Sequence, residues 1–388
     1  MEFHFYSPTK LISGNGVRKE VGKRVSGLGK KCLIVRTPIS EADWEKRFEE
    51  LTTSLSESGI EYTIYDGVRP NPTTDLVEEG VEKAKANDVD FILGYGGGSS
   101  LDTAKAIALF AKNPDLEWKY CFETFSDAFP DTEEPLEALP VVAVTTTSGT
   151  GSHVTQASVI TDSKANDKLT IFHSSLIPKI GIVDPELMIS LPKRMTAITG
   201  FDALAHATES YFNPRASVLT KMLSLKAIEL VVDTLPKLIE DLGNVEYREK
   251  MAYADTLAGV CLSNAGAEAP HPIGEIINGY FPEAAHGETL AFVYPTFLKY
   301  VSDLVPEKAR ALMEVFKEYV PKEQQGTLGE TTCQMMENFL KAIELDDSLS
   351  ALDMSQEIID EIKNKLAFNL PLTTAENLKK IFVESLAK

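Results

Sequence analysis

Residues 91–108 read FILGYGGGSSLDTAKAIA, and this stretch decides the fold class of the first half of the chain. A buried-strand pattern leads into Gly96, Gly97 and Gly98, and a helix-period pattern follows from Ser99. A turn of this kind exposes backbone N–H groups at a helix N-terminus, where the helix dipole favours a phosphate. The stretch therefore predicts a strand, a turn and a helix. The glycines either cradle a pyrophosphate or serve only the turn.

Two further features bear on the cradle. Asp102 lies three residues after Ser99, which is the spacing of a capping box, but the glycines do not follow the G-x-G-x-x-G fingerprint. Residues 145–152, TTTSGTGS, follow another apolar strand and offer hydroxyl and backbone N–H groups. That segment alone is also explained as a polar loop. Two such loops at the carboxyl ends of strands in one sheet are where an open α/β fold binds its ligand.

The alternation of strand and helix extends over most of the first half of the chain. β-branched runs predict strands, and helical periodicity lies between them. The expected strands are residues 31–37, 62–68, 91–96, 141–147, 158–162, 169–174 and 179–185. We predict an α/β domain with a mostly parallel, Rossmann-like sheet over residues 1–190. The acidic, turn-rich segment 123–139 reads as a surface excursion of this domain.

Beyond residue 190 the β-rich runs stop, and amphipathic helical segments take over. Examples are residues 217–242, 307–320 and 375–388. We therefore predict an all-helical domain over residues 191–388, so that the chain forms two domains.

Composition excludes several classes of protein. The chain has 388 residues and a net charge of −20, which opposes binding to nucleic acid or to an anionic membrane surface. No run of about 18 apolar residues and no signal-like N-terminus is present, so we expect a cytoplasmic protein. The four cysteines lie far apart without a CxxC pair and are expected to be reduced thiols.

The helical half carries a candidate metal site. Residues 199–211, TGFDALAHATESY, place Asp202 and His206 four residues apart on one face of a predicted helix. His271 and His286 each lie beside a proline or glycine, fifteen residues apart. One carboxylate with three imidazoles suits Fe(II) or Zn(II) better than Mg(II) or Ca(II). Spacing alone leaves an alternative open, in which Asp202 and His206 form a local helix pair and the other histidines lie on the surface.

Five motifs give the chain a family resemblance. They are YDGVRPNPT, GYGGGSSLDTAKA, TTTSGTGS, TGFDALAHATESY and AAHGETLA. In this order they resemble the motifs of the iron-dependent alcohol dehydrogenase family over most of the chain. The resemblance implies a dehydroquinate synthase-like architecture, with a dinucleotide-binding domain, a helical metal domain and an active site in the cleft between them.

The resemblance also implies roles for individual residues. The implied metal ligands are Asp202, His206, His271 and His286. The implied cofactor contacts are Gly96, Gly97, Gly98, Ser99, Thr146, Thr147 and Thr150, and we place Asp102 in the same group. Asn71 and Lys168 match family positions near the cofactor.

The chain departs from the family pattern at three points. His153 stands where many relatives carry Glu, and Glu275 stands one turn after His271, where many relatives have a further histidine. The interval between the last two ligands is also one residue longer than the commonest pattern. Glu275 is a candidate for relaying the alkoxide proton or binding a polar substrate group, with a solvated helix residue as the alternative.

These observations predict a metal-dependent alcohol dehydrogenase or aldehyde reductase that transfers hydride between a nicotinamide cofactor and a small alcohol or aldehyde. Fe²⁺ is the expected metal, with Zn²⁺ possible, and a homodimer is expected. Thr37 stands where NAD-preferring relatives carry Asp, and Arg36 adjoins it. No acidic side chain here excludes the 2′-phosphate, so we expect a preference for NADP(H), with NAD(H) also usable. The alternatives are glycerol dehydrogenase or dehydroquinate synthase chemistry on the same fold, or a nucleotide-binding protein without catalysis.

Overall fold

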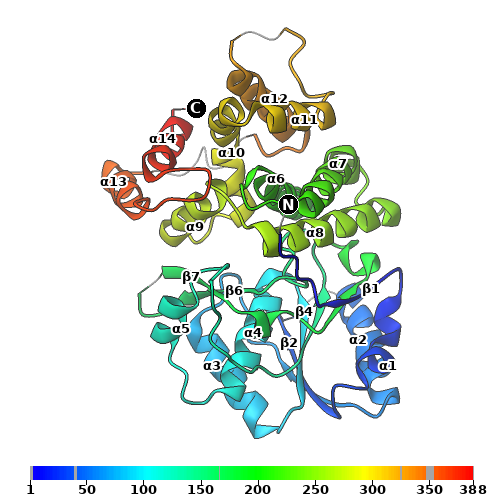
Figure 1. Ribbon diagram of the computed structural model, residues 1–388. Coiled ribbons are helices and arrows are strands. Elements are labelled where there is room, and N and C mark those ends of the chain that lie inside the picture. Colours follow the sequence, from blue (N-terminus) through cyan, green and yellow to red (C-terminus); the bar gives the residue numbers. More distant parts are fainter. Residues whose placement is uncertain (1–2, 39–41, 166, 324–325, 347–353, 388) are drawn as a thin grey trace. The chain divides into compact units, whose positions relative to one another are not determined.

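The protein is represented by a computed structural model that describes residues 3–38, 42–165, 167–323, 326–346 and 354–387 (Figure 1). The chain divides into two compact units. An α/β unit comprises residues 6–191 and 243–252, and a helical unit comprises residues 192–242, the chain from residue 253 onward and the described residues before Tyr6. The division after Leu191 falls beside the expected boundary, but residues 243–252 belong with the α/β unit.

The α/β unit contains a six-stranded sheet in which every neighbouring pair is parallel (Figure 1). The order across the sheet is β1-β8-β5-β4-β2-β3. The strands are β1 (Lys10–Ser13), β2 (Lys31–Arg36), β3 (Glu61–Tyr65), β4 (Phe91–Gly96), β5 (Val141–Thr145) and β8 (Ile180–Val183). The helices of this unit are α1 (Val21–Val25), α2 (Ala42–Glu57), α3 (Thr74–Ala86), α4 (Gly98–Lys112) and α5 (Trp118–Thr124), with 3-10 turns η1 (Val17–Glu20), η2 (Ser174–Leu176) and η3 (Pro185–Met188).

Alternation along the strands gives the sheet two buried faces. In β2, Leu33 belongs to the core cluster that includes residues of α3 and α4, whereas Ile34 belongs to the cluster that includes Phe48 of α2. A parallel sheet covered on both faces reads as continuous apolar runs, which is why the sequence identified its central strands. The excursion predicted for residues 123–139 begins inside α5, which ends at Thr124, and its remaining residues form no helix or strand.

Three strands differ from expectation. The runs predicted at residues 158–162 and 169–174 form β6 (Ala157–Asp162) and β7 (Asp167–Phe172), a separate antiparallel pair. The two strands are too close in sequence for the crossover that a parallel pair needs. The edge strand β1 was not predicted, because its four residues have the exposure pattern exposed, exposed, half-buried, exposed and so lack an apolar run.

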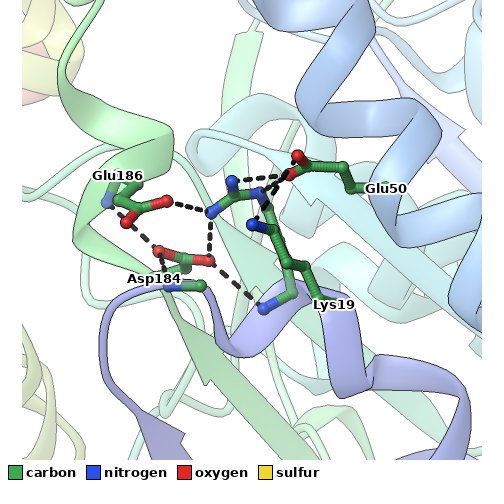
Figure 2. A network of polar contacts seen from close by, with 6 residues as sticks. Lys19, Glu50, Asp184 and Glu186 are labelled. Carbon is green, nitrogen blue, oxygen red and sulfur yellow. Dashed lines mark hydrogen bonds and ion pairs between the residues drawn. The ribbon is translucent and has the colours of Figure 1, made fainter.

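An ion network around a buried arginine holds the first turns of the chain to the end of the sheet (Figure 2). The Arg18 side chain is 4% exposed, and its guanidinium pairs with Glu50 at 2.6 Å, Asp184 at 2.8 Å and Glu186 at 2.7 Å. These partners lie in α2, directly after β8 and in η3 respectively. The Asp184 carboxylate also accepts the backbone N–H of Gly16. One arginine therefore ties together elements that are distant in sequence.

The helical unit is organised around α6 and α10 (Figure 1). Its helices are α6 (Lys193–Phe212), α7 (Val218–Glu240), most of α8 (Val245–Ala265), α9 (Pro270–Tyr280), α10 (His286–Leu304), α11 (Pro306–Val315), α12 (Leu328–Ala342), α13 (Gln356–Lys365) and α14 (Ala375–Ser385). Every residue of α6 from Gly200 onward is buried, and α10 packs against α6, α9, α12 and α14. In the described chain, no helix combines the length and apolar character needed to cross a membrane, and all four cysteines are buried free thiols.

Candidate metal centre and dinucleotide loops

Three helices of the helical unit bring the predicted metal ligands together. Asp202 and His206 lie one turn apart in α6, with 3.7 Å between Oδ1 of Asp202 and Nε2 of His206. Nε2 of His271, at the start of α9, lies 3.6 Å from the same oxygen. His286 begins α10, and one ligand atom each from Asp202, His271 and His286 lie within 4.8 Å of one another. The His206 ring stacks on that of His271 at 4.4 Å between centroids.

Two atoms at this point have unmet bonding capacity. Oδ1 of Asp202 and Nε2 of His271 are buried and have no hydrogen-bond partner among the described residues. Such orphaned buried atoms are costly unless another group satisfies them. A divalent ion with oxygen and imidazole ligands would satisfy both, so the residues present fit Fe(II) or Zn(II). The surface alternative for His271 is wrong, because that side chain is buried.

The outer nitrogen of two of the histidines is held by a neighbouring side chain. Nδ1 of His271 lies 2.7 Å from Oε1 of the fully buried Glu209. Nδ1 of His286 lies 3.1 Å from Oδ1 of Asn278. Such contacts fix ring orientation, and they make Nε2 the coordinating atom in each ring. Sequence reasoning missed both partners, although Glu209 is a second acid on the buried stripe of α6, three residues after His206.

The electrostatics of the cluster favour a positive charge. Burial raises the pKa of the Asp202 carboxyl, but the nearby histidines have the larger effect and lower this pKa to about 2. Burial lowers the pKa of His271, whereas Glu209 and Asp202 raise it to about 10. Two carboxylates thus flank one imidazole in a buried place, and a cation between these groups is stabilised.

A close helix contact places His286 beside the other ligands. A Cβ atom on Gly287 would lie 2.4 Å from the carbonyl oxygen of Ile198, so only glycine permits the first turn of α10 to approach α6 this closely. Glu288 fixes the same turn, because its carboxylate accepts the N–H of Ala285 at 3.0 Å and pairs with Arg194. The glycine that follows His286 in the sequence is therefore part of how the site is built.

The two loops predicted to bind a cofactor touch each other in the α/β unit. Gly96, the last residue of β4, pairs with Thr145 of β5, and α4 starts at Gly98 with no side-chain cap on its first amides. A Cβ atom on Gly98 would lie 2.7 Å from Cγ2 of Thr150. The hydroxyls of Thr146 and Thr147 are buried and have no partner among the described residues. Free helix amides beside unpaired hydroxyls fit a phosphate and ribose ligand.

Asp102 differs from its expected role. The capping-box interpretation is wrong, because the N-cap of α4 is Gly97 and no side chain caps it. The buried Asp102 carboxylate instead accepts the Ser152 hydroxyl at 2.6 Å and the Val159 N–H at 3.2 Å. Lys105, which the sequence did not single out, donates from Nζ to the carbonyl oxygen of Ala157 at 2.8 Å. Helix α4 thereby holds the segment that follows the threonine-rich loop.

The remaining cofactor-site candidates lie around β6 and β7. Lys168 pairs with Thr161 across this ribbon, and the N–H of Thr161 donates to the Pro72 carbonyl at 2.8 Å. The adjoining Asn71 has a positive φ of 52°. The antiparallel pair therefore brings Lys168 close to the loop that carries Asn71.

Thr37 is half-buried directly after β2. Its neighbour Arg36 lies with its guanidinium 4.1 Å from the Phe48 ring centroid, on the α2 side of the sheet. Glu275 lies in α9, four residues after His271, and is half-buried. His153, one of the three departures noted in the sequence, is fully buried.

Comparison with known proteins covers both units. A family model described as iron-containing alcohol dehydrogenase matches residues 8–185, and one described as the C-terminal part of the Fe-containing alcohol dehydrogenase family matches residues 196–386. The chain is 32% identical to the NAD-dependent methanol dehydrogenase of Bacillus methanolicus, over 99% of this chain and 98% of that protein. It is 33% identical to the 1,3-propanediol dehydrogenase of Citrobacter freundii, over 81% of this chain and 80% of that protein.

Solved structures agree with these matches. The alcohol dehydrogenase from Oenococcus oeni superposes with a TM-score of 0.88 at 29% identity, covering 99% of this chain and 100% of that chain. An iron-containing alcohol dehydrogenase from Thermotoga maritima gives a TM-score of 0.84 at 29% identity, with all of both chains covered. The chain belongs to the iron-containing alcohol dehydrogenase family.

Proposed function

We propose that this alcohol dehydrogenase holds a divalent metal ion, Fe²⁺ or Zn²⁺, on Asp202, His206, His271 and His286. One observation carries the proposal: the orphaned Oδ1 of Asp202 faces the orphaned Nε2 of His271 at 3.6 Å in a buried cluster of imidazoles. When bound, the ion supplies Lewis-acid polarisation of the substrate oxygen. Glu209 holds the His271 ring through Nδ1.

We propose that the loops of the α/β unit bind the nicotinamide cofactor, which carries the hydride. The open amides at the start of α4 would face the pyrophosphate, and the hydroxyls of Thr146 and Thr147 would face its sugar or phosphate groups. Asp102 and Lys105 support the cofactor site indirectly. Their hydrogen bonds hold Ser152 at the end of the second loop and Ala157 in the segment that follows. The proposed cofactor site also includes the remaining predicted contacts, which are Gly96, Gly97, Ser99, Thr150, Asn71 and Lys168.

The test of the reaction is steady turnover. Absorbance of the reduced nicotinamide is followed with small primary alcohols, diols and aldehydes, using metal-depleted protein and protein reloaded with Fe(II) or Zn(II). We expect continuous cofactor reduction or oxidation that needs the metal. A dehydroquinate synthase-like reaction would give no net cofactor turnover, and a non-catalytic nucleotide-binding protein would give none with any substrate.

We propose a small alcohol or aldehyde as substrate. Relatives that are named as dehydrogenases of methanol and 1,3-propanediol support this size class. Glu275, one helical turn after His271 in α9, is the proposed contact for a polar substrate group or a proton. Glu275→Gln should change the pH profile of turnover or the ranking of substrates. If both stay as in the wild type, Glu275 is only a helix residue.

We propose that NADP(H) is preferred and that NAD(H) remains usable. The support is Thr37, which presents no carboxylate to repel a 2′-phosphate. Arg36 adds no support, since its guanidinium packs over Phe48. The B. methanolicus relative is named as NAD-dependent, which supports only the use of NAD(H).

The test compares kcat/KM for both cofactors in the wild type and in Thr37→Asp. We expect the variant to lose about tenfold with NADPH, which corresponds to about 1.4 kcal/mol. A wild type that strongly prefers NADH, or a variant with unchanged NADPH efficiency, would remove this proposal.

We also propose a homodimer. The edge position of β1, with Leu11 41% exposed, supports pairing of the chain with a second copy. Light scattering of the protein as it elutes from a size-exclusion column should give twice the chain mass of 42.6 kDa. A mass of one chain at assay concentration would contradict the proposal.

A further inference from the structure

Two buried glutamates connect the proposed ligand His271 with the C-terminal part of the helical unit. Oε1 of Glu209 lies 2.7 Å from Nδ1 of His271, and its Oε2 accepts the backbone N–H of Glu268 at 2.8 Å. The Glu268 carboxylate accepts the backbone N–H of Leu372 and the hydroxyl of Thr373, each at 3.1 Å. An unbroken series of contacts therefore runs from the connection between α13 and α14 to the imidazole.

Three side chains of this series are fully removed from water. Glu209, Glu268 and Thr373 are each 0% exposed. Two carboxylates buried so near each other cost free energy unless hydrogen bonds satisfy them. Glu268 receives two of its hydrogen bonds from Leu372 and Thr373, so this pair of residues holds a buried acid in place.

The position of Glu268 also determines where His271 lies. Glu268 lies two residues before the start of α9, and its carbonyl oxygen accepts the N–H of His271 at 3.3 Å. Thr373 is itself fixed, because its carbonyl oxygen accepts the N–H of Leu370 at 2.8 Å. A shift of Glu268 would thus move both the start of α9 and the N–H that orients Glu209.

We propose that Thr373 is a positioning residue for the metal centre, acting through Glu268 and Glu209 on the orientation of His271. The proposal rests on the ligand set proposed above. Loss of an outer partner of a metal-binding histidine typically weakens metal binding by about 10- to 100-fold. Thr373 lies further from the ring than Glu209, so we expect about 3- to 10-fold for its hydroxyl.

The experiment measures metal affinity instead of turnover. Metal-free full-length protein is titrated with Zn(II) against a chromophoric chelator, and with Co(II) while its ligand-field absorption is recorded. The variants are Thr373→Val, which removes the hydroxyl but keeps the shape, Thr373→Ser, which keeps it, and Glu209→Gln. Thr234→Val is the matched control, because Thr234 is buried in the same unit and its hydroxyl has no partner among the described residues.

We expect Thr373→Val to weaken Zn(II) binding by about 3- to 10-fold and to alter the Co(II) spectrum. Thr373→Ser and Thr234→Val should stay within about twofold of the wild type. In the Glu209→Gln background, Thr373→Val should have a smaller effect, since the contact from Glu209 to His271 is already altered and only the path through the start of α9 remains. Thermal unfolding of the metal-free proteins accompanies the titrations, and Glu268→Gln replaces Thr373→Val if that variant does not fold.

Two results would overturn the role of Thr373. One is a Thr373→Val protein with wild-type Zn(II) affinity, and the other is an equal loss in the presence and absence of Glu209→Gln. His286→Ala separates this failure from failure of the ligand set. If His286→Ala binds Zn(II) as the wild type does, the ligand assignment itself is wrong.

Discussion

At the scale of single residues, some buried polar atoms are satisfied within the protein, and others have no hydrogen-bond partner among the described residues. Glu209 and Asp102 belong to the first group, because each carboxylate oxygen has a hydrogen-bond partner. Oδ1 of Asp202, Nε2 of His271 and the Thr146 hydroxyl belong to the second group. Native proteins rarely leave such atoms unpaired, and these three lie at the predicted ligand sites, so they mark where ligands are expected.

His153 gives a prediction for stability at low pH. Burial, with a smaller contribution from Lys105, lowers its pKa to about 3 from an ordinary 6.5. Between these values the unfolded chain binds more protons than the folded one, so stability falls as the pH drops below 6.5. From about pH 7.5 to about pH 5.5, the wild type should lose about 1.4 kcal/mol more unfolding free energy than His153→Gln.

Denaturant titration at the two pH values measures this difference. The exposed His4 supplies the control, since His4→Gln should follow the wild type. Equal losses in the wild type and His153→Gln would contradict a folded-state pKa far below 6.5.

The sequence predicted some of these residues and not others for a physical reason. Asp202 and His206 are close in sequence, so helical geometry alone brings them together. Glu209 meets His271 across 62 positions, and Glu268 meets Thr373 across 105. Contacts of this kind depend on how helices pack, which residue spacing does not determine.

At the scale of elements, buried apolar runs were the reliable signal. Strands β2, β4 and β5 were predicted within two residues of their observed ends, because both faces of the sheet are covered. The exposed strand β1 gave no such signal. The runs of β6 and β7 were found but placed in the wrong sheet, since residue patterns do not specify a strand's partner.

The Arg18 network gives an element-scale prediction. Asp184 is 0% exposed and pairs with Arg18, so Arg18→Met would leave a buried carboxylate without its cation (Figure 2). Breaking a buried pair in this way should lower the unfolding free energy by about 3 to 5 kcal/mol. Arg24→Met removes an exposed pair with Glu20 from the next helix and should cost less than about 0.5 kcal/mol.

Chemical denaturation of the three proteins measures both values. Similar stabilities of Arg18→Met and Arg24→Met would show that the network does not hold η1, α2 and η3 together.

At the scale of the whole molecule, each unit contributes a different part of the proposed chemistry. The α/β unit carries the glycine and threonine loops, and the helical unit carries Asp202 and the three histidines. The two family models match these two parts of the chain in the same order. Hydride transfer at a polarised oxygen requires both parts, so loss of the metal should stop turnover even when the cofactor loops are intact.

The most direct measurement combines metal content and turnover in His286→Ala. The variant lacks one proposed ligand, and the exposed His4→Ala serves as its control. We predict about one divalent ion per chain in the wild type and in His4→Ala. In His286→Ala the bound ion should be largely lost, and kcat/KM should fall by more than about 100-fold. That loss exceeds the about 10- to 100-fold loss typical when a residue that only orients a metal ligand is replaced. A His286→Ala protein that keeps both metal and turnover near the wild-type values would contradict the proposed metal centre.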